Sequence, residues 1–347
     1  MHRQLRRITT GNVALTLATG ILIAACSGSA VTTAPATTGP SAPPASASAA
    51  PTTAAPIRVS AVFYSKAIAY FQDMISGMQD EAETLGVTLD INYANFNVTE
   101  EFNLLQNAIT TKPDGLLLAP LDPVAFVPLV KKAHEEGIPL VTVGDDVAEE
   151  GRQFELAFVG PSFKEMGARK AQWIADALNG TGSVIVIHGP RGIDFVEGQK
   201  VGYEEVFAKY PGIEVIEGPY GNISSDVGLA STENMLTAFP NPSAIMYDSE
   251  DLAIGGIRAL QERKVAPGTI LMVASDGTKA GIDGVRNGTL AITVSENAYV
   301  NGRTAIRVLY DAIVNGVTPA KWVPIELITI TPENVNSLPP DILPPGQ

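Results

Sequence analysis

The chain has 347 residues, more than one domain usually holds, so its length predicts two domains. Hydrophobic residues make up 45% and charged residues 17%, which supports an ordinary folded core. The formal net charge of −14 argues against binding to nucleic acid, which requires a basic face, and against adsorption to an anionic lipid surface. With one cysteine and three histidines, the chain has no disulfide framework or multi-cysteine metal site, and we expect neither a metal nor a cofactor.

The first 25 residues have the order of a secretory signal peptide: Arg3, Arg6 and Arg7, then an apolar run over residues 13–23, then two alanines before Cys26. The apolar run is too short for a comfortable transmembrane helix. Residues 23–26 (Ile-Ala-Ala-Cys) resemble a lipobox, the processing site of bacterial lipoproteins. This resemblance implies that Cys26 is lipidated and that the chain is anchored to the extracytoplasmic side of the bacterial cell membrane. The alternative is a plain signal peptide with an incidental cysteine.

Residues 26–56 predict a tether between this anchor and the folded part. After Cys26 the segment contains only Ser, Gly, Ala, Val, Thr and Pro, with no charged or aromatic side chain. Such a composition buries too little apolar surface to offset the entropy of ordering the chain, and its prolines keep it extended.

From residue 57 the pattern alternates between strands and helices. We expect strands over residues 57–63, 87–93, 115–118, 138–143, 156–159, 183–188, 213–216, 244–247, 270–274, 290–294 and 325–328. We expect helices over residues 70–85, 100–110, 123–136, 164–178, 196–210, 227–239, 252–263, 279–287 and 299–314. This alternation predicts an α/β fold with parallel sheets covered on both faces. There are too many elements for one compact sheet, so we expect two doubly wound lobes.

The loops that follow the expected strands are candidates for a binding site, because ligands bind at the carboxyl ends of such strands. These loops carry acidic and aromatic side chains: Tyr64, Tyr70, Phe71, Asp122, Asp145, Asp146, Asp194, Phe195, Asp248, Glu250, Asp251, Asp276 and Glu296. Carboxylates accept hydrogen bonds from hydroxyls and aromatic rings cover apolar C–H faces, so the combination suits a sugar. The alternative is that strand-end acids cap helices, which we favour for Asp122, Glu250 and Asp251. For Asp145 and Asp276 we favour ligand contact.

A series of motifs resembles the type I periplasmic binding proteins of the ribose-binding kind. They are YF (residues 70–71), GMQDEA (77–82), DGLLL (114–118), GIPLV (137–141), GY (202–203), SEDLAIG (249–255), SDGT (275–278) and GTLA (288–291). The resemblance implies two lobes joined by a three-segment hinge near residues 160–162, 294–296 and 322–325. The first lobe would comprise residues 57–160 and 297–323, the second residues 161–294, and residues 324–347 would form a C-terminal strand and tail.

The family's functional residues fall on particular positions of this sequence. Its ring-stacking aromatics fall on Tyr70 and Phe71, its late aspartate on Asp276 and its hinge amide on Glu296. The chain departs from the family where an arginine is replaced by Gln199, and Lys66 or Arg191 is then the candidate donor. The full set of predicted ligand-binding residues is Tyr64, Lys66, Tyr70, Phe71, Asp145, Asp146, Ser162, Arg191, Phe195, Gln199, Ser249, Asp276 and Glu296.

The sequence therefore predicts a monomeric binding protein that captures a sugar or polyol by hinge closure and delivers it to the permease subunits of an ABC transporter. The loss of an arginine and the gain of Glu296 make the site more acidic than a ribose site, so a ligand bearing an amine is an alternative. A sensor that reports to a chemotaxis or signalling receptor is another. We do not expect an enzyme, because no Ser-His-Asp order, acid–base carboxylate spacing or phosphate-binding loop is evident. A transcription regulator would need a DNA-binding motif where the signal and tether stand.

Overall fold

The computed structural model describes residues 56–339, which lie within one compact unit that spans Ala54–Gln347. The predicted signal peptide, the lipidation site Cys26 and all but the last residue of the predicted tether lie outside the described residues. Among the helices of residues 56–339, none has the length and apolar character needed to span a bilayer.

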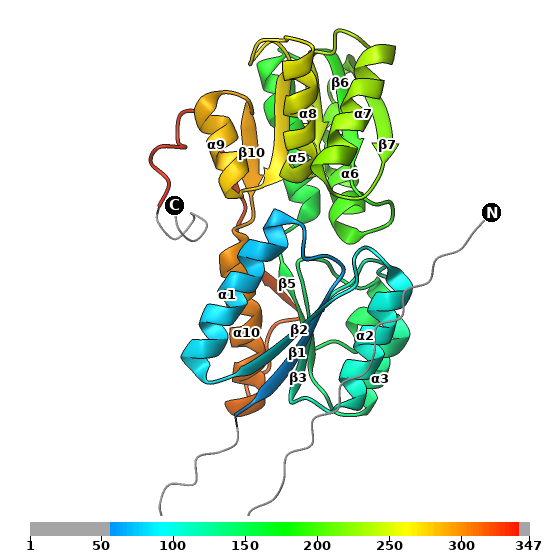
Figure 1. The fold of residues 1–347 in the computed structure, drawn as a ribbon, viewed down its shortest axis with the longest axis vertical. Coiled ribbons are helices and arrows are strands. Elements are labelled where there is room, and N and C mark those ends of the chain that lie inside the picture. Colours follow the sequence, from blue (N-terminus) through cyan, green and yellow to red (C-terminus); the bar gives the residue numbers. More distant parts are fainter. Residues whose placement is uncertain (1–55, 340–347) are drawn as a thin grey trace, which may run out of the picture. The chain divides into compact units, whose positions relative to one another are not determined.

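The first lobe is built on a six-stranded sheet in which every strand pairing is parallel, with the order β11-β5-β4-β3-β1-β2. Its strands are β1 (Arg58–Phe63), β2 (Thr88–Tyr93), β3 (Gly115–Ala119), β4 (Leu140–Val143), β5 (Ala157–Gly160) and β11 (Trp322–Pro324). Its helices are α1 (Ala69–Leu85), α2 (Val98–Thr110), α3 (Val127–Glu135), α4 (Glu149–Arg152) and α10 (Ala298–Val314). Helices α1 and α10 cover one face of the sheet, and α2 and α3 cover the other (Figure 1).

The contact between α1 and α10 depends on two glycines. A Cβ atom at Gly77 would lie 2.0 Å from the carbonyl oxygen of Tyr299, and one at Gly302 would lie 1.9 Å from that of Met74. Because these distances are shorter than any real Cβ contact, only glycine lets the two helix backbones approach so closely. The C-terminal helix α10 is thereby fixed against the first helix of the same lobe.

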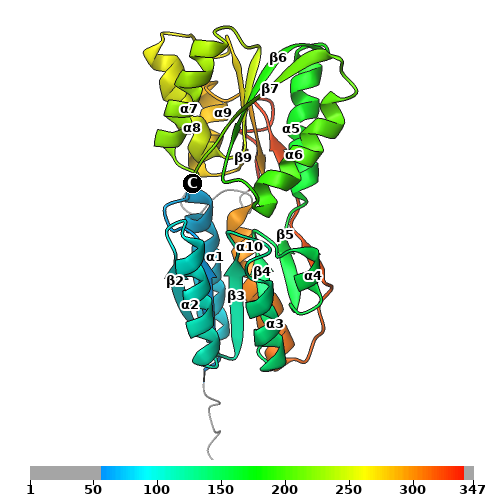
Figure 2. The same ribbon diagram turned by 90° about the vertical axis from the view of Figure 1, so that its right-hand side faces the viewer.

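The second lobe has a second six-stranded sheet with the order β12-β10-β9-β8-β6-β7. Its strands are β6 (Thr181–His188), β7 (Gly212–Tyr220), β8 (Ala244–Tyr247), β9 (Leu271–Asp276), β10 (Ile292–Ser295) and β12 (Ile328–Ile330). Its helices are α5 (Phe163–Ala177), α6 (Asp194–Phe207), α7 (Ser225–Ala238), α8 (Glu250–Glu262) and α9 (Lys279–Asn287). Figure 2 shows α5 and α6 on one side of this sheet and α7 and α8 on the other. Only β12 runs antiparallel to its neighbour, β10.

The chain passes between the two sheets three times, after β5, after β10 and after β11. The two-lobed, doubly wound α/β fold expected from the sequence is thus confirmed. The prediction of a last strand over residues 325–328 is wrong, because β11 ends at Pro324 in the first sheet and β12 begins at Ile328 in the second. The Ile325 N–H still donates to the Gly160 carbonyl at 3.1 Å, and the chain then crosses to the second sheet.

Candidate ligand-binding site

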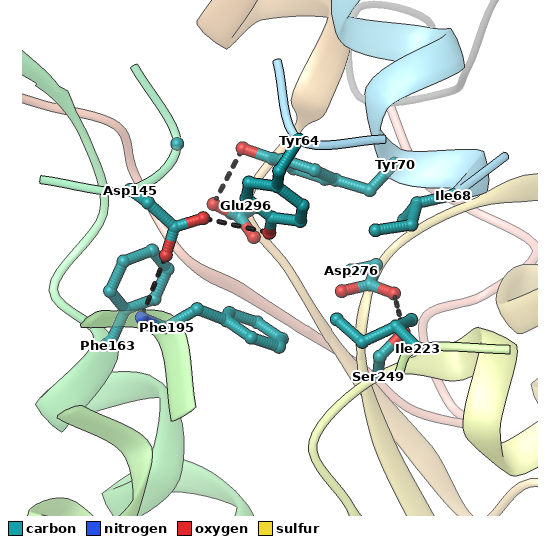
Figure 3. Close-up of a pocket in the computed structure, with 11 residues that line it drawn as sticks. Tyr64, Ile68, Tyr70, Asp145, Phe163, Phe195, Ile223, Ser249, Asp276 and Glu296 are labelled. Atoms are coloured by element: carbon teal, nitrogen blue, oxygen red, sulfur yellow. Dashed lines mark hydrogen bonds between the residues drawn. The ribbon is translucent and has the colours of Figure 1, made fainter. Parts of the chain in front are cut away.

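A small pocket, with a cavity volume of about 20 Å³, lies where the carboxyl ends of both sheets meet (Figure 3). Residues of the first lobe, of the second lobe and of the second crossing line it: Tyr64, Ile68, Tyr70, Gly144, Asp145, Phe163, Phe195, Ile223, Ser249, Asp276 and Glu296. Four of these side chains are aromatic and three are carboxylic acids, whereas none is Lys, Arg or His. The pocket therefore offers hydrogen-bond acceptors beside aromatic rings.

On the first-lobe side, tyrosine hydroxyls hold the carboxylates in place. The Tyr64 hydroxyl, directly after β1, donates to Asp145 Oδ2 at 3.0 Å. The Tyr70 hydroxyl, in the first turn of α1, donates to Glu296 Oε2 at 3.1 Å and accepts from Asn301 Nδ2 at 2.9 Å. Since the Asn301 amide group only donates at that atom, it directs the Tyr70 proton toward Glu296. Glu296 Oε1 accepts no hydrogen bond from a described side chain or backbone group.

On the second-lobe side, Asp276 ends β9 in an unusual backbone conformation, with a φ of 138°. Its Oδ2 accepts hydrogen bonds from the Ser249 hydroxyl at 2.9 Å and from the Glu250 N–H at 3.1 Å. These two bonds leave Oδ1 as the oxygen that faces the pocket (Figure 3). A non-glycine residue at positive φ is strained and occurs preferentially at functional sites, which is consistent with a role in binding.

A buried polar scaffold beneath the pocket fixes Asp276 from behind. The Glu250 carboxylate accepts from the N–H of Gly277 at 2.9 Å and that of Thr278 at 2.8 Å, and also from the hydroxyls of Thr278 and Thr293. Lys170 lies nearby, fully buried, and donates to the Tyr247 carbonyl at 2.7 Å. Because the donors and acceptors named here all belong to the second lobe, the geometry of this scaffold is set within that lobe.

Burial dominates the electrostatics of the pocket. It raises the pKa of Asp145 to about 7 and raises the pKa of Glu296 well above its usual range. Burial, followed by the charge of Glu250, does the same to the pKa of Asp276. Burial also lowers the pKa of Lys170 to about 8. The pocket thus disfavours ionised carboxylates, and a ligand that donates hydrogen bonds or carries positive charge stabilises them.

Two helices that face the pocket are capped from the opposite lobe. Helix α1 begins after Ile68, which offers no capping side chain, and its Ala69 N–H donates to Asp251 Oδ2 of the second lobe at 3.0 Å. Helix α6 begins after Ile193, which is also apolar, and its Phe195 N–H donates to Asp145 Oδ1 of the first lobe at 2.9 Å. We call these two hydrogen bonds the interlobe caps. Both oxygens of Asp145 are occupied, one by Tyr64 and one by α6.

The predicted site residues divide into two groups. Those that line the pocket are Tyr64, Tyr70, Asp145, Phe195, Ser249, Asp276 and Glu296. The structure does not bring the remaining six to it: Lys66, Phe71, Asp146, Ser162, Arg191 and Gln199.

Each of the six has another role in the structure. Phe71 is 1% exposed and packs its ring against Phe63 and Tyr64 in the core. Gln199 is buried and bonds to backbone carbonyls and to Ser275.

Asp146 and Ser162 line a separate groove beside the first crossing. The two candidate cationic donors lie over rings outside the pocket, Lys66 over Tyr93 and Arg191 over Tyr220.

Four lining residues were not among the predicted ligand contacts: Ile68, Gly144, Phe163 and Ile223. Ile68 and Gly144 lie in strand-end loops that the sequence marked, and Phe163 follows the first crossing, but apolar residues and glycine carry no chemical signal. Ile223 lies in the loop after β7, which ends at Tyr220, and no residue of that loop was among the candidates predicted from the sequence.

Comparison with known proteins identifies the class. A model of the periplasmic binding protein domain matches residues 59–316, so the chain belongs to the periplasmic binding proteins. Its fold and motifs place it among the type I, ribose-binding-like members, as the sequence predicted. Family membership implies a location outside the cytoplasm.

Individual relatives bind several polyhydroxylated compounds. The chain is 26% identical over 247 residues to a xylitol-binding protein of Mycolicibacterium smegmatis, a match covering 70% of this chain and 68% of the relative. It is 29% identical over 236 residues to the D-allose-binding periplasmic protein of Escherichia coli, covering 66% and 75%. Among solved structures, it is similar to a periplasmic ribose ABC transporter protein from Conexibacter woesei, with 36% identity, a TM-score of 0.71 and coverage of 82% and 94%.

Proposed function

We propose that this protein is the extracytoplasmic binding component of an ABC importer and captures a small polyhydroxylated ligand, a sugar or polyol, in the pocket between its lobes. The observation that carries this proposal is the pairing of open carboxylate oxygens, on Asp276 and Glu296, with a wall of four aromatic rings. The xylitol, allose and ribose relatives support the same ligand class. Binding without chemistry and a monomeric state follow the family pattern.

The chemistry of the pocket suits such a ligand. A hydroxyl that leaves water loses its hydrogen bonds, so it needs a strong acceptor inside the pocket. Asp276 Oδ1 is such an acceptor, held in position by Ser249 and Glu250. The rings of Phe163 and Phe195 offer apolar surface for the C–H faces that a sugar presents between its hydroxyls.

Capture requires the two lobes to open and close, and the interlobe caps favour the closed state. In an open conformation the N–H groups of Ala69 and Phe195 would face water, and on closure Asp251 and Asp145 satisfy them. A ligand that contacts both lobes shifts the population further toward the closed state, because it binds that state more tightly.

A thermal-shift screen tests the proposal. The purified protein is heated with each member of a panel of pentoses, hexoses, pentitols, hexitols and inositols, and a bound compound raises the melting temperature. We expect at least one compound to raise it, and X-ray scattering with that compound to give a smaller radius of gyration than without it. Absence of any shift across the panel would contradict the assignment of a sugar or polyol ligand.

The membrane anchor is part of the same proposal. We infer that Cys26 is lipidated and that residues 26–56 hold the lobes off the membrane. Changing Cys26→Ser removes the sulfur that would be acylated, so fractionation of cells should move the protein from the membrane to the soluble fraction. Continued membrane association of the variant would contradict the lipid anchor.

A further inference from the structure

The charges around the pocket point to more than a neutral sugar. We propose that the ligand carries a protonated amine beside its hydroxyls, and that this ammonium group lies between Asp276 and Glu296. The inference rests on the proposed function, since it specifies the ligand of the same pocket.

The first argument is the balance of charge. Three carboxylic acids line the pocket, each at most 4% exposed, and Glu250 lies directly behind Asp276 at 1% exposed. Among residues 56–339, the fully buried lysine beside this group is Lys170. Its charge interacts favourably with Asp276 and Glu250, but its ammonium donates hydrogen bonds to the Tyr247 carbonyl and the Ser275 hydroxyl, so it leaves the open oxygens of the lining acids without a donor. One lysine does not balance four buried acids; carboxylates removed from water without enough positive charge nearby are costly, and a neutral polyol supplies no charge to offset that cost.

The second argument is which oxygens remain open. Asp145 has both oxygens committed, to Tyr64 and to the interlobe cap on α6. Asp276 and Glu296 each have one oxygen committed, Oδ2 and Oε2, which leaves Oδ1 and Oε1. An ammonium group has three donors and makes charge-assisted hydrogen bonds to carboxylates, so a single group carries enough donors for both open oxygens.

The third argument is the aromatic wall. Tyr64, Tyr70, Phe163 and Phe195 surround the same space. The face of an aromatic ring attracts a cation, and this attraction strengthens where water is excluded. A pocket lined by aromatic rings and carboxylic acids, with no basic residue among them, is complementary to an amine and unfavourable for an anion.

The experiment compares matched compounds that differ only in one group. Calorimetric titration at pH 7 is carried out with three pairs: glycerol and 2-amino-1,3-propanediol, D-glucose and D-glucosamine, and D-glucitol and 1-amino-1-deoxy-D-glucitol. We expect the amine of at least one pair to bind ten times or more tightly than its hydroxyl counterpart. The variant Glu296→Gln keeps the size of the side chain and removes its charge, so it should reduce or reverse that preference. Glu165→Gln, which alters an exposed acid on α5 paired with Arg169, is the control and should keep the preference.

The outcomes separate the inference from the proposed function. If a hydroxyl compound binds as tightly as its amine in every pair that binds, the amine inference is wrong and the sugar or polyol assignment stands. If Glu296→Gln leaves an amine preference intact, the placement of the ammonium group is wrong. If neither member of any pair binds while a neutral sugar from the wider panel does, the amine inference is again overturned. If nothing in the pairs or the panel binds, both proposals fail.

Discussion

The two lobes build their halves of the pocket in different ways. In the second lobe, Asp276 is held by Ser249 and by Glu250, which in turn accepts four hydrogen bonds from its own lobe. In the first lobe, Asp145 is held by the single hydroxyl of Tyr64 and gains its second partner, the Phe195 N–H, from the other lobe. The second-lobe half is therefore complete in either conformation, whereas the first-lobe half is completed by closure. This difference predicts that changes in the second lobe affect stability and intrinsic affinity, and that changes in the first lobe affect the closing equilibrium.

The largest expected effect comes from the scaffold of the second lobe. Glu250→Ala leaves two backbone N–H groups and two threonine hydroxyls without their acceptor. Because each unsatisfied buried donor costs about 1–3 kcal/mol, we expect the free energy of unfolding to fall by about 4 kcal/mol. Urea denaturation measures this, with Glu262→Ala, an exposed acid on the same helix, as control. If Glu250→Ala has the same unfolding midpoint as the wild type, the Glu250 scaffold does not stabilise the second lobe and the contrast between the lobes is wrong.

The next effect is on affinity. Asp276→Ala removes the carboxylate that faces the pocket, and we expect ligand affinity to fall by about 2–3 kcal/mol, since a desolvated donor on the ligand loses its acceptor. Calorimetry with the best compound from the screen measures it. Asp283→Ala, which removes a partly exposed acid of α9, should bind like the wild type. Unchanged affinity of the Asp276 variant would mean that the ligand lies elsewhere.

A smaller effect is expected in the first lobe, where two variants of one residue sharpen the comparison. Asp145→Ala removes the cap on α6, and a helix cap contributes about 1 kcal/mol, so affinity should fall about fivefold through a less favourable closing step. Asp145→Asn retains an oxygen that accepts from the Phe195 N–H and should lose less. Equal losses in both variants would show that the charge of Asp145, and not its capping bond, matters.

The last effect concerns alkaline pH and the second lobe. Burial lowers the pKa of His188, but hydrogen bonds and charges from Asp248 and Glu217 outweigh it and raise the value to about 9. The folded state then binds a proton more tightly than the unfolded state, so this stabilisation is complete below about pH 6.5 and is lost as the pH rises to about 9. Melting temperatures measured across this range should fall, and they should fall less in Glu217→Gln. If the melting temperatures of the wild type and of Glu217→Gln fall equally with pH, the pair of His188 and Glu217 does not cause the loss of stability.

Much of the fold followed from the sequence, because buried parallel strands form continuous apolar runs and the helices between them are amphipathic. The last two strands could not be predicted in this way, because β11 and β12 have three residues each and so short a run shows no hydrophobic periodicity. Their pairing with different sheets depends on tertiary contacts that periodicity does not report.

The site was predictable in its acids and less so in its rings. Tyr70 and Phe71 are neighbours in α1, and consecutive helical residues point about 100° apart, so one faces the pocket and the other faces the core. Phe71→Ala should therefore act first on stability. The sequence predicts Glu250 and Asp251 as caps of their own helix, but Ser249 caps α8. Glu250 accepts hydrogen bonds from the loop after β9, and Asp251 accepts one from helix α1. These hydrogen-bond partners lie far from Glu250 and Asp251 in the sequence, so no local sequence pattern predicts them.

The three crossings also determine the order in which the molecule can be completed during synthesis. The first sheet lacks α10 and β11 until residues beyond β10 have been made, and the second sheet lacks its edge strand β12 until later still. Domains usually fold as units in the order of their synthesis, but here neither lobe is a unit until nearly all of the described chain exists. We expect the nascent chain to remain without either finished lobe over most of its synthesis, a state compatible with threading through an export channel.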